Sequence, residues 1–441
     1  MPLSIVNSLT RQEQSLTLDK TKPVKLYVCG ITPYDNAHIG HGRVYVTFDL
    51  LVRLLQFHGY TVDYVRNITD VDDKLINKAL EQGDATQFAV IANHFYELFA
   101  SAMTKLGCLK PSAEPRVTQC IPEIIAFISG LIEANHAYQS GADVYFDINS
   151  LAEYGKLSRR DSNALQAGAR VDINDKKRHP GDFALWKGTN DAVHWPSPWG
   201  NGRPGWHIEC SVMAKKHLGI TIDIHGGGMD LIFPHHENEI AQSEALHKAP
   251  FAHYWMHNAF VNINKEKMSK SLSNFVTLND MFAQKDPMVI RFYYLQHQYR
   301  NPIDFSFDDL NATEVAYKKL VTHFGSVQPV ATTATDNAII ASMINALSTD
   351  LNTPKFLGLV FEHIALAKQD AALASAISVL LKTVLGLSLL PLSEATSPIT
   401  PEIEALLAER EQARKNKNWA LADKLRDQLL ALGHNIQDKR L

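Results

Sequence analysis

The sequence has 441 residues, a length that predicts about three domains and a large buried core. Apolar residues (45 %) and charged residues (20 %) occur in the proportions of an ordinary folded soluble protein. The net charge of −4 neither predicts nor excludes nucleic-acid binding, since basic patches can be local. The four cysteines form no Cys-x-x-Cys pair, which excludes a zinc ribbon and a thioredoxin-like motif and favours reduced thiols in the cytosol.

A predicted strand at Val24–Cys29, ended by Gly30, leads into a helix whose apolar residues recur at helical spacing. His38, Gly40 and His41 fall in or beside the first turn of that helix. Free backbone N–H groups and the positive end of the helix dipole lie there, so the turn suits a phosphate group. Two histidines could equally decorate such a turn without any function, so this motif alone does not decide between the two interpretations.

A second predicted strand, Thr61–Arg66, follows the first helix. Strand, helix and strand at this spacing form a βαβ unit, which predicts a parallel sheet. Ligands of such sheets bind at the carboxyl ends of the strands. Cys29 and Thr69 are both expected near that edge.

An inserted segment is predicted next. Helical patterns cover residues 86–106 and 121–139, and Asp143–Asp147 has the pattern of a strand. Residues 161–205 are rich in charge, proline and glycine, which predicts loops rather than core.

The parallel sheet is expected to resume at residue 206. The elements predicted there are a helix that opens at Trp206–Met213, a strand at Thr221–His225, a flexible turn at Gly226–Asp230, a helix that starts at Phe233 and a strand at Trp255–Ile263. His235 and Glu239 are four residues apart, so they face the same way on their helix.

A lysine-rich loop, Asn264–Asn274, follows that strand and contains Lys267 and Lys270 among hydroxyl side chains. Its lysines could hold a triphosphate as mobile point charges, or the loop could be a solvated surface turn. The sequence contains neither a P-loop nor a G-x-G-x-x-G motif. The order His-Ile-Gly-His, then Lys-Met-Ser-Lys-Ser about 225 residues later, favours the phosphate interpretation, because two such rare motifs seldom coincide.

With both motifs in view, the sequence resembles the class I aminoacyl-tRNA synthetases, which build their active site from HIGH and KMSKS motifs on a Rossmann-like sheet. Its finer match is to the cysteinyl-tRNA synthetase family, across most of residues 24–310. The stretches that carry this match are Tyr27–Asp35, Asn67–Lys74, Ser197–Cys210, Gly226–Glu239 and Lys267–Ser271. The resemblance implies an α/β fold: a catalytic domain with a Rossmann-like parallel sheet and an inserted segment, followed by C-terminal all-helical domains.

The same resemblance implies one zinc ion held by Cys29, Cys210, His235 and Glu239. All four are acceptable zinc ligands, although spacing alone would not identify them, because isolated cysteines are more often small buried hydrophobes. Zinc would bind the thiolate of cysteine in preference to the hydroxyl of serine, which would make hydrolytic editing unnecessary.

The remaining roles are also implied by the family. ATP, with Mg²⁺ on its phosphates, would be bound by His38, Gly40, His41, Lys267 and Lys270. L-Cysteine would be surrounded by Cys29, Gly30, Thr69, Trp206, His225 and Asp230. Without the resemblance, Trp206 would be interpreted as a core aromatic, His225 as a buried strand histidine, and Thr69 and Asp230 as turn residues.

From about residue 308 onward the pattern is almost entirely helical. The expected division is a first half of the catalytic domain at 1–120, a connective segment at 121–200, a second catalytic half at 201–265, a KMSKS loop and stem-contact region at 266–310, a helical bundle at 311–390, a linker at 391–401 and truncated anticodon-binding helices at 402–441.

Basic residues in the last segment lie near Trp419, an arrangement that suits an RNA backbone and an unstacked base. These residues are Arg410, Arg414, Lys415, Lys417, Lys424 and Arg426. A solvated helix face explains them equally well, since acidic residues nearly balance the charge. Family members continue into a short tryptophan-containing segment that helps to read the anticodon, whereas this sequence ends at Leu441.

Neither a signal peptide nor a membrane span is expected: Met1–Ser8 lacks a charged and apolar leader, and the apolar stretch Ala376–Leu390 is too short.

The expected partners are L-cysteine, ATP and tRNA(Cys), and the protein is expected to be a cytoplasmic monomer. Two alternatives remain at this point. One is the related ligase that joins cysteine to a glucosaminyl-inositol in mycothiol synthesis, and the other is an inactive zinc- or RNA-binding relative.

Overall fold

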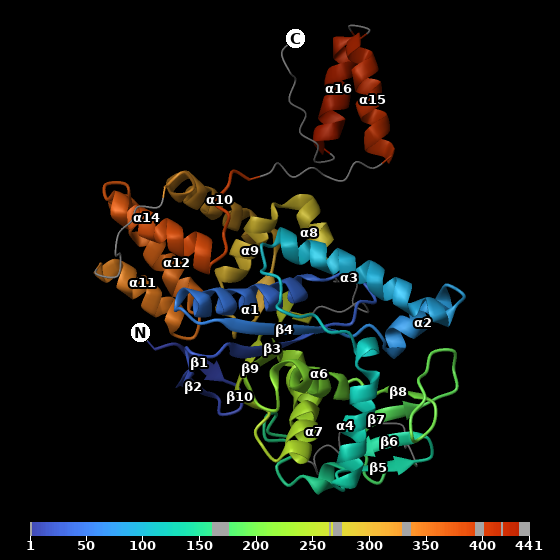
Figure 1. Ribbon diagram of the computed structural model, residues 1–441. Helices are drawn as coiled ribbons and strands as arrows, with labels where there is room; N and C mark the ends of the chain where they lie inside the picture. The colour runs from blue at the N-terminus through green and yellow to red at the C-terminus, as the bar shows by residue number, and fades with distance from the viewer. Residues whose placement is uncertain are drawn as a thin grey trace.

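The computed structural model describes residues 2–160, 176–263, 266–267, 276–328, 337–392, 401–415 and 418–431. Its centre is a four-stranded parallel sheet in the order β10 (Ala252–Asn258), β9 (Ile222–Gly228), β3 (Val24–Ile31), β4 (Val62–Ile68). Helix α1 (Ile39–Phe57) covers one face, and α6 (Ile208–Leu218) and α7 (Glu237–His247) lie on the other (Figure 1). This layering confirms the predicted α/β class with a Rossmann-like parallel sheet.

The alternation of side chains along β3 separates the two faces of the sheet. Leu26 and Val28 belong to the apolar core on the α1 side, whereas Tyr27 and Cys29 belong to the core on the α6 and α7 side. This is the period of two expected of a strand. Cys29 therefore points toward the layer that contains Cys210 of α6.

The inserted segment forms an antiparallel sheet in the order β5 (Ala137–Ser140), β6 (Asp143–Phe146), β7 (Phe183–Gly188), β8 (Gly202–Pro204). The predicted helix at 121–139 is too long: α4 (Ile121–Glu133) ends because Asn135 adopts a left-handed conformation, with φ of 61°, before β5 begins. The prediction of loops at 161–205 is wrong for β7, whose Leu185 and Trp186 are fully buried.

The strand expected at Trp255–Ile263 is in fact two strands. β10 ends at Asn258, and β11 (Val261–Ile263) pairs in another sheet with β12 (Glu266–Lys267) and β13 (Ile303–Phe305). The chain changes sheet at Ala259 and Phe260, whose carbonyl groups accept hydrogen bonds from the side chain of Arg43. The carbonyl of Phe260 also accepts from the backbone N–H of Ile303 (3.0 Å), at the start of β13.

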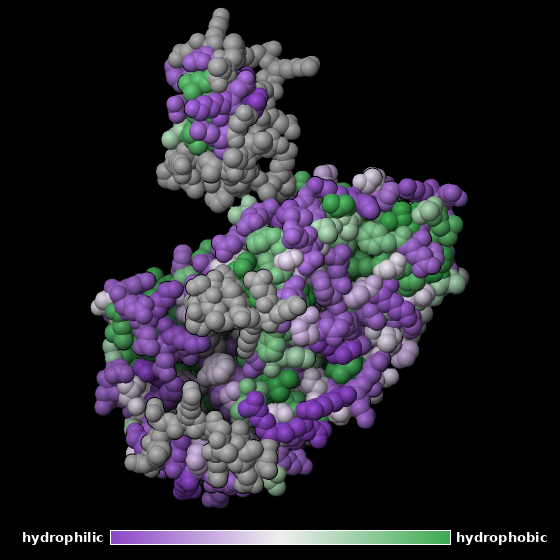
Figure 2. Space-filling model, turned by 180° about the vertical axis from the view of Figure 1, so that it is seen from behind, coloured by the Kyte–Doolittle hydropathy of each residue, from purple (hydrophilic) through white to green (hydrophobic). Residues whose placement is uncertain are grey.

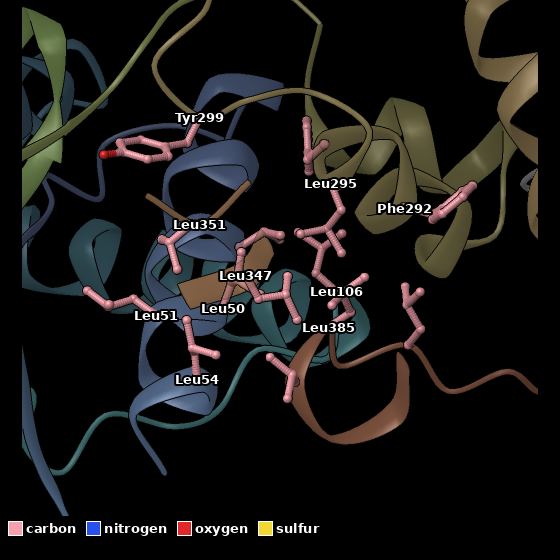
Figure 3. Close-up of a cluster of buried hydrophobic side chains, with 14 of the residues drawn as sticks. Leu50, Leu51, Leu54, Leu106, Phe292, Leu295, Tyr299, Leu347, Leu351 and Leu385 are labelled. Atoms are coloured by element: carbon pink, nitrogen blue, oxygen red, sulfur yellow. The ribbon is translucent and has the colours of Figure 1, made fainter. Parts of the chain in front are cut away.

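Helices beyond the sheets surround the outer side of α1. They are α2 (Asp73–Glu81), α3 (Phe88–Lys105), α8 (Leu278–Gln284), α9 (Pro287–Leu295), α10 (Phe307–Phe324), α11 (Ala338–Ser348), α12 (Thr353–Glu362), α13 (Ile364–Ala367), α14 (Ala371–Val379) and a π-helical turn at Leu380–Val384. Of these, α3, α8, α9 and the π-helical turn pack directly on α1. Figure 3 shows Leu50, Leu51 and Leu54 of α1 among Leu106, Leu347 and Leu385 of the surrounding segments. Each fully buried leucine contributes about 1.5–3 kcal/mol, so this cluster fixes α1 firmly.

A β-hairpin at the N-terminus and a helical hairpin near the C-terminus complete the described part of the chain. An N-terminal hairpin, β1 (Ser4–Asn7) and β2 (Gln12–Ser15), was not predicted. The C-terminal helices α15 (Pro401–Lys415) and α16 (Trp419–Ala431) pack on each other and stand apart from the body in Figure 1. Arg410 is buried there, so it does not contribute to an exposed basic face.

Seen from the opposite side, the surface is mostly hydrophilic and is hollowed near its centre (Figure 2). Within the described ranges, none of the helices has the length and apolar character needed to cross a membrane.

Candidate active site

A cavity of about 470 Å³ opens at the carboxyl edge of the parallel sheet, beside the N-terminus of α1. Its lining includes predicted site residues from the N-terminal turn of α1 (His38, Gly40 and His41) and from other segments (Cys29, Gly30, Trp206 and Asp230). A cavity at this edge, between a strand end and a helix start, is where parallel α/β sheets bind their ligands.

The two histidines cap α1 reciprocally. The backbone N–H of His41 donates to Nδ1 of His38 (3.3 Å), and the backbone N–H of His38 donates to Nδ1 of His41 (3.2 Å). Each Nδ1 is thus an acceptor, so the neutral ring carries its proton on Nε2. Burial and the neighbouring His38 lower the pKa of His41 well below its usual value. At neutral pH the turn therefore offers an uncharged imidazole donor together with the end of the helix dipole.

The segment that follows the lysine loop is bonded directly to this turn. The N–H of Ile39 donates to the carbonyl of Val276 (3.2 Å), and the N–H of Leu278 donates to that of Ala37 (2.8 Å). Lys267 lies on β12, paired with Asn262 of β11. Lys270, with residues 268–275, falls outside the described part of the chain. The loop thus begins and ends on backbone that is anchored at the cavity.

Four of the predicted residues meet below the cavity. The possible ligand atoms of Cys29, Cys210, His235 and Glu239 all lie within 4.8 Å of one another. The two Sγ atoms are 3.9 Å apart, Cys29 Sγ is 3.4 Å from Glu239 Oε1, and His235 Nε2 is 3.0 Å from the same oxygen. Tetrahedral zinc with Zn–S bonds of about 2.3 Å would separate two sulfur ligands by about 3.8 Å, so this donor set fits the ion.

The electrostatics of the cluster favour the charged forms of Cys210 and Glu239 and the neutral thiol of Cys29. Burial raises the pKa of Cys210, but the hydrogen bond from Cys29 and the charge of His235 outweigh it and lower that pKa to about 6. Burial raises the pKa of Glu239, yet His225 and His235 hold it well below its usual value. Burial raises the pKa of Cys29 well above normal, as expected for a second thiol beside a thiolate.

A second set of donors shares two members with the first. Cys29, His225, His236 and Glu239 also lie close enough to hold an ion. His236 Nε2 is 3.3 Å from Cys29 Sγ, while its Nδ1 is 2.8 Å from Nε2 of His257. This set contains one thiol where the first has two, and zinc sites use thiolates preferentially, so the first set fits zinc better.

The remaining predicted residues differ in their exposure to the cavity. Trp206 is 40 % exposed, and its ring centroid lies 4.5 Å from that of His235. His225 is fully buried against Glu239, with 2.8 Å between Nε2 and Oε2, and it does not line the cavity. Thr69 is also buried, and its hydroxyl donates to Glu209 Oε1 (2.7 Å). Asp230, in the short turn Met229–Leu231, does line the cavity.

Sequence reasoning missed several groups in this region. Lys74 and residues 258–261 line the cavity, His236 lies beside the thiol of Cys29, and His257 is hydrogen-bonded to His236. His236 could have been found, because it is three residues before Glu239 on the same helical stretch. Residues 258–261 carried no such signal, because no titratable side chain or motif marks them in the sequence.

The comparisons with known proteins agree with this geometry. A family model described as "tRNA synthetases class I (C) catalytic domain" matches residues 15–315, and one described as "Cysteinyl-tRNA ligase anticodon binding domain" matches residues 396–440.

Two curated relatives are similar over nearly their whole length. The "Cysteine--tRNA ligase" of Geobacillus thermodenitrificans is 45 % identical, over 99 % of this chain and 97 % of its own length. The "Cysteine--tRNA ligase" of Bacillus pumilus is 43 % identical, over 99 % of this chain and 98 % of its own length. A solved leucyl-tRNA synthetase complex from Agrobacterium radiobacter shares the fold, with a TM-score of 0.60, 11 % identity and 84 % of each chain covered.

Proposed function

Because the chain belongs to the cysteine–tRNA ligase family of the class I tRNA synthetases, we propose that ATP and L-cysteine meet in the cavity beside α1. The chain is an ATP-dependent ligase that activates cysteine as cysteinyl-adenylate and transfers it to the 3′-terminal ribose of tRNA(Cys). The observation that carries the site assignment is that His38 and Cys29 line one cavity, so a phosphate site and a thiol site adjoin there.

ATP is proposed to bind with its phosphates at the capped end of α1. His38 and His41 donate from Nε2, Gly40 permits close approach to the backbone, and Lys267 and Lys270 supply positive charge from the loop. Mg²⁺ would accompany the phosphates. Phosphoryl transfer of this kind needs positioning and charge stabilisation more than an acid–base side chain, and this set of residues supplies both.

Zinc is proposed to be held by Cys29, Cys210, His235 and Glu239, which the donor types and separations support. When bound, zinc would supply a direct metal–sulfur bond to the substrate thiolate. Shape alone discriminates near-isosteres such as cysteine and serine by only about 10- to 200-fold. The metal bond could supply the roughly 4–7 kcal/mol needed for a ratio of about 10³–10⁵.

The cysteine pocket is proposed to divide into a contact layer and a supporting layer. Gly30, Trp206 and Asp230 line the cavity and would contact the amino acid. His225 orients the carboxylate of Glu239, and Thr69 holds the carboxylate of Glu209 next to Cys210. The buried pair would then act through the groups that they orient.

The carboxylate of cysteine attacks the α-phosphorus of ATP, which forms the mixed anhydride and releases pyrophosphate. The terminal ribose hydroxyl of the tRNA then attacks the activated carbonyl, and AMP leaves. The oxygen charge that develops in the first step faces the donors of the α1 turn.

For the rest of the chain we propose the division expected from the sequence, with one adjustment: the inserted sheet extends to Pro204. The helical hairpin α15 and α16 would bind the anticodon end of the tRNA, as the match at residues 396–440 supports. A cytoplasmic monomer is proposed as well, and the four unbonded cysteines favour a reducing compartment.

The comparisons favour this function over the two alternatives. The ligase of mycothiol synthesis has no anticodon-binding appendage of this kind, whereas this chain matches an anticodon-binding family at its C-terminus. An inactive relative would have no use for the capped histidine turn beside the thiol cluster.

ATP–pyrophosphate exchange tests the proposal. Exchange should require L-cysteine, reject L-serine, and fall sharply after zinc chelation, with recovery when zinc is restored. Charging of tRNA(Cys) should follow the same pattern, whereas glucosaminyl-inositol should not accept cysteine. Exchange that is indifferent to cysteine would refute the catalytic assignment, and cysteine selectivity that survives complete metal removal would refute the zinc assignment.

A further inference from the structure

Arg43 lies in the second turn of α1 and is only 1 % exposed. All four of its recorded hydrogen bonds go to backbone carbonyl groups, and within the described ranges it forms no ion pair with a carboxylate. A buried guanidinium without a counter-charge is energetically costly. Its structural role therefore lies in the geometry of its hydrogen bonds.

The four carbonyls belong to two separate segments. Nη1 of Arg43 donates to Ala259 (2.9 Å) and Phe260 (2.8 Å), between β10 and β11. Nη2 donates to Gln298 (3.1 Å) and to Asn301, between α9 and β13. The planar fork of one side chain therefore holds two irregular stretches of backbone side by side.

The first of these segments is a wall of the cavity. Residues 258–261 line it together with His38 and His41. Ala259 and Phe260 lie between strands, and two backbone hydrogen bonds join them to the second segment: from Ala259 N–H to Tyr299 (2.8 Å) and from Ile303 N–H to Phe260 (3.0 Å). Arg43 is the group that ties both segments to α1. Thr47, one turn after Arg43, bonds Oδ1 of Asn258 through its hydroxyl (2.9 Å). The helix that begins at the histidine turn thus also fixes the opposite wall.

We propose that Arg43 is a positioning residue for ATP, because it sets the separation between the histidine turn of α1 and the wall formed by residues 258–261. The same contact anchors β11, the strand that leads to Lys267. Arg43 touches the wall by its backbone and does not line the cavity itself. This inference rests on the proposed binding of ATP in that cavity.

Lysine cannot replace arginine in this role. An ammonium group has three donors on one atom, whereas the guanidinium presents N–H groups from two separate terminal nitrogens within one plane, one nitrogen for each segment. Arg43→Lys keeps the charge and most of the side-chain volume but cannot bond both segments in the same geometry. Its effect should therefore appear in the shape of the ATP site.

Steady-state ATP–pyrophosphate exchange, with ATP and cysteine varied separately, tests the proposal on the full chain. Arg43→Lys should raise the KM for ATP about tenfold or more, while the KM for cysteine and the zinc content stay within about twofold of the parent. Arg53→Lys is the matched control, because Arg53 is on the same helix but bonds Asp49 and Gly107 away from the cavity. In this variant the KM values for ATP and for cysteine should both equal those of the parent.

Thr47→Val covers the case in which Arg43→Lys does not fold. Loss of the Thr47–Asn258 bond should raise the KM for ATP about threefold, again without a change for cysteine. An unchanged KM for ATP in a folded Arg43→Lys or Thr47→Val enzyme would overturn the inference. Equal increases for both substrates, with lost zinc, would also overturn it, because they indicate general loosening. Failure of the parent enzyme to show cysteine-dependent exchange would instead refute the proposed function.

Discussion

Substitution of His41 can separate its structural role from its chemical one. Nδ1 of this ring accepts the backbone N–H of His38, which places the proton on Nε2. The amide oxygen of His41→Asn can take the place of Nδ1 but leaves no donor at the position of Nε2. His41→Gln does the reverse, because its longer amide can place a donor near Nε2 and gives up the cap.

The magnitudes follow from the two contacts. Loss of a capping acceptor costs about 0.5–2 kcal/mol of stability. Loss of one preorganised donor to a developing oxyanion costs about 10²–10³ in rate. His41→Asn should therefore keep its stability and lose exchange activity, whereas His41→Gln should lose some stability and retain more activity.

Exchange rates at saturating ATP and cysteine, together with urea unfolding, measure both effects. Because the pKa of His41 is held well below normal, the activity of the parent should show no loss from protonation of this ring between pH 6 and 8. A His41→Asn enzyme that exchanges at the parental rate would refute the donor role. Lost exchange in His41→Gln together with parental exchange in His41→Asn would show that the cap alone matters.

Two further predictions concern stability. Asp49→Asn removes the carboxylate that pairs with the fully buried Arg291, so urea unfolding should show a loss of about 3–5 kcal/mol, and a loss below 1 kcal/mol would contradict it. Burial raises the pKa of Asp73, but Lys187 and Arg203 outweigh it and hold that pKa below its usual value. The stabilisation is therefore present above the unfolded-state pKa near 4 and disappears as the pH falls through the lower folded-state pKa. Asp73→Asn should accordingly flatten the acid end of the plot of unfolding free energy against pH. An unchanged plot would contradict the stabilising role of the Asp73 ion pairs.

Local patterns in the sequence predicted the elements that carry the site. The alternation in Val24–Cys29 and the helical spacing after His41 correspond to β3 and α1, because both elements are buried along their length. β7 was missed because a short strand between charged loops leaves little periodic signal, although Trp186 is buried in it. The break at Ala259 was missed because the groups that bond there are distant in sequence; the side chain of Arg43, for example, is 216 residues away.

The thiol cluster could not be predicted from spacing. Cys29 and Cys210 are 181 residues apart and meet only because β3 and α6 pack on the same face of the sheet. A family resemblance supplied these residues, and the geometry now gives the physical reason for their proximity. Thr69 and His225 were expected around the amino acid, yet their burial behind Glu209 and Glu239 makes orientation of those carboxylates the better-supported role.

Helix α1 unites these observations. Its N-terminus presents the histidines, its second turn holds the cavity wall through Arg43, and its middle is fixed by Asp49 and a leucine face against the helical domain (Figure 3). The helical domain therefore does more than carry the C-terminal hairpin, because it buries the apolar back of the helix that shapes the proposed ATP site. A catalytic fragment cut at residue 306 would expose part of that face, and we expect it to lose its cooperative unfolding transition as well as its exchange activity. A fragment that kept both would show that the packing of α1 against the sheet alone maintains the site.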